Sequence, residues 1–175
     1  MATRIEKDFL GEKEIPDDAY YGVQTLRGKE NFHITGIPMS LEPNFTKALG
    51  YVKKAAVLAN RELGVLDPKV AESIAWACDR LIAGEMRDQF VTDFIQGGAG
   101  TSTNMNANEV IANLALERLG HKKGEYQYVN PNDHVNFGQS TNDMYPTAFR
   151  LALILRLRSY MEALTRLQNA FFAKA

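Results

Sequence analysis

Three stretches of the sequence combine residue types that could bind a ligand or move a proton, and all three lie between residues 97 and 143. The first leads into a predicted helix and reads Gly97-Gly98-Ala99-Gly100-Thr101-Ser102-Thr103-Asn104. Small residues let the backbone approach a ligand closely, and the N–H groups and dipole of a helix N-terminus favour an anion. It is no P-loop, because no Gly-Lys-Ser/Thr follows, and Thr103 breaks the dinucleotide-binding fingerprint. Taken alone, the stretch fits a capped turn as well as an anion site.

The second stretch, Gln139-Ser140-Thr141-Asn142-Asp143, stands at the start of a long predicted helix. Two adjacent hydroxyls and an amide at a helix N-terminus could bind a carboxylate with neutral donors backed by the helix dipole. Capping the helix needs only one of these side chains. The surplus of polar groups suggests a binding site without requiring one.

The third stretch spans residues 130–136 and contains His134. A single histidine in a loop is more often a hydrogen-bonded structural residue than a general base. The sequence holds no His-Glu-x-x-His or Gly-x-Ser-x-Gly motif, and its one cysteine, Cys78, excludes a Cys-based zinc site. The residues therefore predict no metal and no cofactor, and we expect Cys78 to be a buried, unreactive thiol.

Amide side chains gather around these stretches. Eight of the twelve asparagines fall between Asn104 and Asn142. Asparagine is a poor helix former and is costly to bury without hydrogen bonds. The clustering predicts a hydrogen-bonded site or a buried polar network.

The elements that must position these residues are mainly helical. Apolar residues recurring at three- and four-residue steps predict helices over about 43–63, 68–83, 103–119 and 142–174. In the third helix we expect Met105, Val110, Ile111, Leu114 and Leu119 to face inward. Residues 1–40 are interrupted by glycine and proline and predict turns with a short hairpin, and residues 121–141 predict a long loop.

The last helix is unusual because it is apolar on nearly every side from Ala148 to Leu157. At about 1.5 Å per residue it would be about 48 Å long, too long for the other helices to cover. Such a helix must be surrounded by other helices or by partner subunits. It also reaches Ala175 without a stop signal, so we expect the chain to end where the protein needs more.

Composition narrows the class of protein. The chain of 175 residues is 45% hydrophobic and 23% charged, which is ordinary for a globular protein. Its 20 basic and 21 acidic side chains nearly cancel, and this balance argues against a nucleic-acid or anionic-membrane partner. The charged start is unlike a signal peptide, and no apolar run is long enough to span a bilayer. We expect a cytoplasmic protein.

Together, these stretches resemble the motifs of the aspartase/fumarase superfamily. Residues 97–113 (GGAGTSTNMNANEVIAN) resemble its first substrate segment, and residues 130–136 (NPNDHVN) with 139–143 (QSTND) resemble its second. The N-terminus also matches at residues 4–8, 17–27 and 30–32. Fumarases usually have Gly-Ser-Gly-Thr at 98–101, His-Pro-Asn-Asp at 130–133 and Ser-Ser-Asn at 140–142. The differences here favour the aspartase branch, with class II fumarase as the alternative.

The resemblance implies reversible anti-elimination of ammonia from L-aspartate to give fumarate, through an enediolate intermediate. By similarity, Thr101, Ser140 and Thr141 would hold the β-carboxylate of the substrate, and Asn142 would contact its amino group. No metal or cofactor takes part in that reaction. The family's serine base lies in a Gly-Ser-Ser-x-Met-Pro-x-Lys-x-Asn loop, which does not occur in these 175 residues. We therefore expect no catalytic base in this chain, and little activity from it alone.

The resemblance also implies a mainly α fold. Residues 1–141 would form a small helical N-terminal domain with an irregular or short β start, and residues 142–175 the first long helix of a central helical bundle. In the family, four subunits pool these helices in a homotetramer, and each site draws on three chains. A non-catalytic structural or assembly role is the other alternative for a chain of this length.

Overall fold

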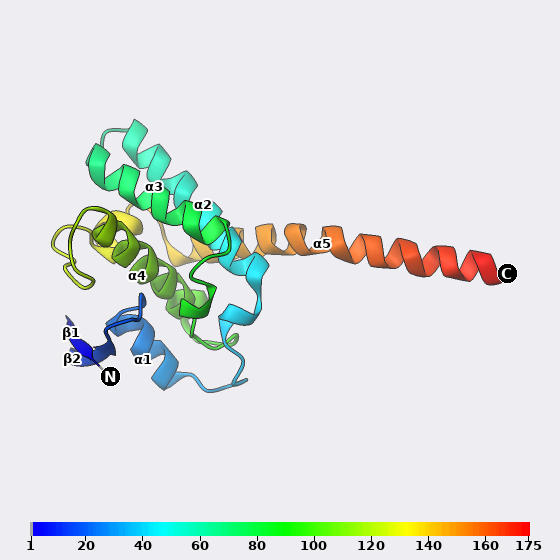
Figure 1. Ribbon diagram of the computed structural model, residues 1–175, viewed down its shortest axis with the longest axis horizontal. Coiled ribbons are helices and arrows are strands. Elements are labelled where there is room, and N and C mark those ends of the chain that lie inside the picture. The colour runs from blue at the N-terminus through cyan, green and yellow to red at the C-terminus, as the bar shows by residue number, and fades with distance from the viewer. Residues whose placement is uncertain (1) are drawn as a thin grey trace.

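In the computed structural model, which describes residues 2–175, one long helix projects from a body of shorter helices (Figure 1). The elements in chain order are β1 (Thr3–Asp8), β2 (Gly11–Pro16), α1 (Val23–Asn31), α2 (Pro43–Glu62), α3 (Pro68–Ile82), α4 (Thr101–Arg118) and α5 (Thr141–Lys174). Single 3₁₀ turns lie at Met39–Leu41, Arg87–Gln89 and Gly98–Gly100, and one π-helical turn lies at Pro131–Val135. The mainly α prediction is confirmed.

Helices α2 and α3 form a closely packed pair on one side of the body (Figure 1). Asp67 begins α3 by accepting hydrogen bonds from the N–H groups of Lys69 and Val70, as its place before Pro68 predicts. A Cβ on Gly50 would lie 3.1 Å from the carbonyl oxygen of Cys78, so the absence of a side chain lets the two helices approach. Cys78 itself is buried and unpaired, as expected.

Helix α4 runs through the centre of the body, and every residue from Thr103 to Leu116 is buried. Met105, Val110, Ile111 and Leu114 are buried, as predicted. The other residues of this stretch are buried as well, because α1, α3 and the 131–135 turn surround the helix. The helix begins at Thr101, two residues earlier than the pattern indicated. Leu119, expected to face inward, lies just beyond the helix and is exposed.

The N-terminal region is more regular than glycine and proline spacing suggested. The short hairpin is confirmed, with β1 and β2 antiparallel and Asp8 paired with Gly11 at the turn. Helix α1 was not predicted from the sequence. Its N-cap residue is Gly22, which has no side chain that could cap the helix. The capping group comes from α4 instead, 87 residues along the chain.

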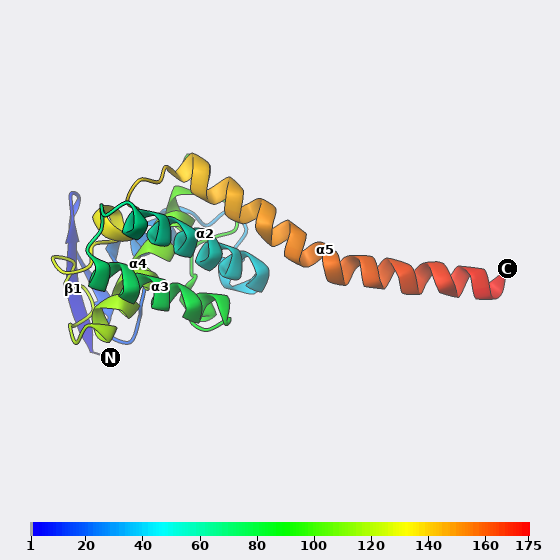
Figure 2. The ribbon, with the colours of Figure 1, turned by 90° about the horizontal axis from the view of Figure 1, so that it is seen from above.

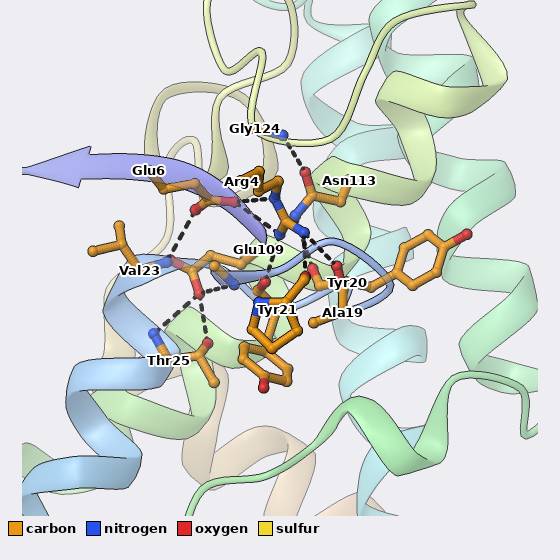
Figure 3. A network of polar contacts seen from close by, with 12 residues as sticks. Arg4, Glu6, Ala19, Tyr20, Tyr21, Val23, Thr25, Glu109, Asn113 and Gly124 are labelled. Carbon is orange, nitrogen blue, oxygen red and sulfur yellow. Dashed lines mark hydrogen bonds and ion pairs between the residues drawn. The ribbon is translucent and has the colours of Figure 1, made fainter. Parts of the chain in front are cut away.

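That group is the carboxylate of Glu109, which lies at the centre of a buried polar network (Figure 3). It accepts hydrogen bonds from the backbone N–H groups of Gly22, Gln24 and Thr25 at 2.8–3.0 Å, and from the Thr25 hydroxyl at 2.5 Å. Glu6 of β1 accepts from the N–H of Val23 beside it. Desolvation raises the pKa of Glu109 to about 7, against the lowering effect of the hydrogen bonds from Thr25 and Gln24. The network connects the hairpin and α1 to the middle of α4 through hydrogen bonds.

Helix α5 packs against α2 over its first three turns and then leaves the body (Figure 2). Ala148 and Ala152 are buried in this contact. Beyond Ala152 most apolar side chains are exposed, among them Leu153, Ile154 and Leu157. Pro146 lies in the second turn of the helix. In residues 2–175 no helix is long and apolar enough to cross a membrane.

Candidate active site

The stretch from Gly97 to Gly100 turns sharply into the N-terminus of α4. Gly98, Ala99 and Gly100 all adopt left-handed backbone conformations, with φ values of +69°, +53° and +91°. Alanine in this region carries roughly 1 kcal/mol or more of strain, so the loop is held by its surroundings. A Cβ on Gly100 would lie 2.2 Å from the ring of Tyr145 in α5, so only glycine fits there. The loop is therefore shaped by backbone geometry and by contact with α5.

The first residues of α4 carry the polar groups that this loop presents. Thr101 is exposed, and its hydroxyl donates to the carbonyl oxygen of Gly98 at 2.6 Å. The side chain of Gln96 reaches back to Thr103, accepting from its N–H at 2.7 Å and donating to its hydroxyl at 2.5 Å. Gln96 thus takes up the third N–H of the helix, while Thr101 stays at the surface.

The N-terminus of α5 is built from side chains rather than from glycine. Ser140 caps the helix by accepting from the N–H of Asp143 at 3.2 Å, and its hydroxyl donates to the Asp143 carboxylate at 2.8 Å. Ser140 and Asn142 are exposed, and Thr141 is half-buried. Of the four polar side chains from Ser140 to Asp143 that could cap the helix, Ser140 is the one that does so.

One buried asparagine joins the two helix N-termini. The Asn104 side-chain amide, one turn into α4, donates to the hydroxyl of Thr141 at 3.3 Å and to Asn136 Oδ1 at 3.1 Å. The side-chain oxygen of Asn104, Oδ1, is itself buried with no hydrogen-bond partner among residues 2–175. The buried network expected from the asparagine cluster is present, and Asn104 is the member that connects the two candidate binding segments.

The predicted site residues face two neighbouring recesses. Ala99, Gly100 and Asn142 line a pocket of about 380 Å³ together with Tyr145 and Pro146. Thr101 instead lines a recess of about 500 Å³, together with Ser102 and Arg27. Ser140 and Thr141 line neither of these two recesses. The structure therefore brings the two segments together around the 97–100 loop, with Thr101 and Asn142 on different sides of it.

The stretch around His134 has a structural role, as the single-histidine argument predicts. His134 Nδ1 accepts from the backbone N–H of Asn130 at 2.9 Å. Asn130 in turn caps the π-helical turn by accepting from the N–H groups of Asn132 and Asp133. These hydrogen bonds engage Nδ1 of His134 within its own turn. Across residues 2–175 no three His, Cys, Asp or Glu side chains lie close enough to hold a metal ion.

One buried group beside this site was not singled out from the sequence. The side chain of Lys53 in α2 is fully buried and donates to the side chains of Asn136 and Gln139. In the sequence Lys53 is one of two adjacent lysines in an amphipathic helix, where a solvated side chain is the ordinary expectation. Only the helical phase, which places Lys53 between Leu49 and Val57 on the buried face, marks it out.

Comparison with known proteins places this arrangement in a family. The family model described as "Lyase" matches residues 11–175. The chain belongs to this lyase family. It is 56% identical over 172 residues to the aspartate ammonia-lyase of Helicobacter pylori strain J99, and 57% identical over 173 residues to that of Pseudomonas aeruginosa. These alignments cover 98–99% of this chain but only 36–37% of the relatives. The protein is therefore a homologue of the aspartate ammonia-lyases, and the chain spans little more than a third of their length.

Solved structures agree with this membership. A fumarate lyase:delta crystallin from Brucella melitensis, bound to cobalt, superposes with a TM-score of 0.96 at 54% identity, over 99% of this chain and 38% of that chain. A recombinant class II fumarase from Schistosoma mansoni superposes with a TM-score of 0.80 at 36% identity, over 86% of this chain and 32% of that chain. The aspartase branch is thus closer in sequence than this fumarase, in line with the differences at 98–101, 130–133 and 140–142.

Proposed function

We propose that the protein catalyses, or forms part of a catalyst of, the reversible elimination of ammonia from L-aspartate to give fumarate. The observation that carries this proposal is the 56–57% identity to curated aspartate ammonia-lyases over 98–99% of the chain. The juxtaposition of two helix N-termini rich in neutral donors supports it, because a dicarboxylate can be bound there without a metal.

In this proposal a base removes a proton from Cβ of aspartate, and the β-carboxylate carries the charge as an enediolate until the Cα–N bond breaks. Thr101, Ser140 and Thr141 hold that carboxylate. Hydrogen bonds that strengthen as the negative charge develops lower the barrier rather than only tightening binding. Asn142 contacts the departing amino group. Because Thr101 lines a different recess from Asn142, the 97–100 loop must present both on one side when substrate is bound.

The chain supplies the carboxylate-binding residues in this proposal, and we assign the base to none of its residues. The family's serine loop does not occur in the 175 residues, and the curated relatives are nearly three times as long as the matched segment. The non-catalytic, structural alternative applies to the 175-residue chain by itself. The elimination reaction is proposed for the complete gene product.

We also propose that residues 1–141 act as the N-terminal domain, that residues 142–175 are the first helix of a central bundle, and that the protein assembles as a cytoplasmic homotetramer. The exposed apolar side chains along α5 support this assembly, because such a surface is costly in water. Light scattering of the complete gene product should give four times the subunit mass. A single-subunit mass at micromolar concentration would contradict the assembly.

The test of the reaction uses the complete gene product and two substrates. With L-aspartate it should produce fumarate, followed by its ultraviolet absorbance, and an equal amount of ammonia. With L-malate it should produce no fumarate. Fumarate from malate but not from aspartate would assign the protein to the fumarase branch, and no product from either would overturn the proposal.

A further inference from the structure

Lys53 is buried in a way that ordinary core packing does not require. Its side chain has no exposed surface, and it is among the largest fully buried side chains of residues 2–175. Burying an amine is costly unless hydrogen bonds or an opposite charge compensate for the lost solvation. Loss of solvation lowers the pKa of Lys53 to about 7, and the partners of its nitrogen are the neutral oxygens of Asn136 and Gln139. A methionine of similar length would fill the same space without this cost.

Both hydrogen bonds of Lys53 end on the turn that leads into the second candidate binding segment. Its Nζ lies 2.8 Å from Asn136 Oδ1 and 3.0 Å from Gln139 Oε1. The two amides are also fixed within the turn, because Asn136 Nδ2 donates to the carbonyl oxygen of Gln139, and Gln139 Nε2 donates to that of Val135. Two carbonyl oxygens that converge on one point repel each other unless a donor with at least two N–H groups lies between them. Lys53 is that donor.

The same turn is connected to the first candidate segment. Asn136 Oδ1 accepts from Asn104 as well as from Lys53, and Asn104 donates to the hydroxyl of Thr141. The chain of contacts therefore runs from α2 through the 135–139 turn to the starts of both α4 and α5. The cap residue Ser140 follows Gln139 directly, so a shift of the turn moves the hydroxyls of Ser140 and Thr141 with it.

We infer that Lys53 is a positioning residue for this site: its side-chain nitrogen holds Asn136 and Gln139 and thereby sets where the Ser140 and Thr141 hydroxyls stand. Lys53 touches no substrate. It acts through the turn, and the inference rests on the proposed function, because the hydroxyls it places are the proposed carboxylate-binding groups. A displacement of about 1 Å in such groups costs about a hundredfold in rate.

Lys54 provides a matched control on the same helix. It is adjacent to Lys53 and is half-exposed, with its Nζ 2.6 Å from Asp79 of α3. In the complete gene product, Lys53→Met should lower kcat for L-aspartate by about tenfold to hundredfold and raise KM less than it lowers kcat. Lys54→Met should leave both constants within about twofold of wild type, because exposed ion pairs contribute little.

Hydrogen–deuterium exchange gives a readout that does not depend on activity. Peptides covering 130–143 should exchange faster in Lys53→Met than in wild type and in Lys54→Met, while peptides from the middle of α3 stay unchanged. A variant that loosens α2 and α3 throughout but keeps wild-type kcat for its folded fraction would overturn the inference, since Lys53 would then be merely structural. Exchange and kinetics equal to those of Lys54→Met would also overturn it.

A second variant covers the case in which Lys53→Met does not fold. Gln139→Met removes one acceptor and leaves the lysine and Asn136 in place, so it should produce the same local exchange change and a smaller loss of kcat. Unchanged exchange over 130–143 and unchanged kcat in this variant would contradict the inference. If wild type shows no turnover of aspartate, the proposed function fails separately, and local exchange in the variants then decides whether Lys53 positions the turn.

Discussion

The N-termini of α4 and α5 present similar chemistry but are held in different ways. The start of α4 is shaped by its backbone, with three successive left-handed residues and a glycine against Tyr145. The start of α5 is held by side chains, with Ser140 as its cap and the 135–139 turn anchored on Lys53 of α2. A loop that approaches a ligand through its backbone leaves a local signature in glycines. A loop held by distant side chains leaves none.

The largest expected effect is on the reaction itself. Thr141→Val removes the hydroxyl that receives the Asn104 bond and that we propose binds the β-carboxylate, while keeping the shape of the side chain. Removing one such donor costs about 10²–10³ in kcat. Thr147→Val is the matched control, because Thr147 is exposed and bonds only to the Asp143 carbonyl oxygen within the same helix. Steady-state kinetics that show equal kcat for the two variants would refute the assignment of Thr141.

The second prediction concerns stability, and it tests whether backbone geometry and contact with α5 shape the start of α4. Gly100→Ala places a Cβ in the ring of Tyr145 and in a left-handed conformation, so it should lower the free energy of unfolding by roughly 3 kcal/mol. Gly120→Ala has a similar φ of +85° with no atom within 4 Å, so it should lose only about 1 kcal/mol. Urea titration measures both. Equal losses would mean that the Tyr145 contact does not constrain the loop.

The pH dependence of stability separates two buried groups, Glu109 in the middle of α4 and Lys53 beside the turn that leads into α5. The pKa of Glu109 is raised to about 7 from 4.5, so the folded state binds more protons than the unfolded state within that window. Its contribution to the free energy of unfolding therefore falls as pH rises from 4.5 to 7. The pKa of Lys53 is lowered to about 7 from 10.5, so the unfolded state binds more protons, and its contribution rises with pH above 7.

Thermal or urea unfolding across pH tests these two signs. Glu109→Gln should flatten the fall below pH 7, and Lys53→Met should flatten the rise between pH 7 and about 9. The upper limit avoids Cys78, which faces Lys53 from α3 and whose pKa is raised by burial to about 12. The same slope in wild type and variant would show that the group in question does not titrate in that window.

The smallest effect concerns capping. Ser140→Ala removes the acceptor for the Asp143 N–H and should lower the free energy of unfolding by about 1 kcal/mol. At the start of α4 the side chain that caps the helix is Gln96, which accepts from the N–H of Thr103. Thr101→Ala should therefore change stability by less than half of that, because the Thr101 hydroxyl bonds only to the carbonyl oxygen of Gly98. Chemical denaturation distinguishes the two. A larger loss for Thr101→Ala would reverse the comparison.

The sequence predicted the helices wherever local rules decide them. The Asp67-Pro68 start of α3 and the long run of α5 are examples, because a cap and a periodic pattern are both local. Helix α1 was missed because its N-terminus is satisfied by Glu109 from α4 rather than by a neighbouring side chain. Leu119 was misplaced because α4 is buried on all sides, so a one-sided pattern could not locate its end.

The candidate site divides in the same way. Its glycine-rich loop and the polar start of α5 were recognisable from residue types in a short window. Lys53 was not, because its partners Asn136 and Gln139 lie 83 and 86 residues further along the chain. The recess that each residue faces was also beyond sequence reasoning, since it depends on how the 97–100 loop packs on Tyr145.

A crystal structure of the complete gene product with fumarate tests most directly whether the two helix N-termini form one carboxylate site. We expect one carboxylate of fumarate within hydrogen-bonding distance of the hydroxyls of both Thr101 and Thr141. Fumarate held by only one of the two N-termini, or bound instead in the cavity between the β1–β2 hairpin and residues 130–133, would contradict it.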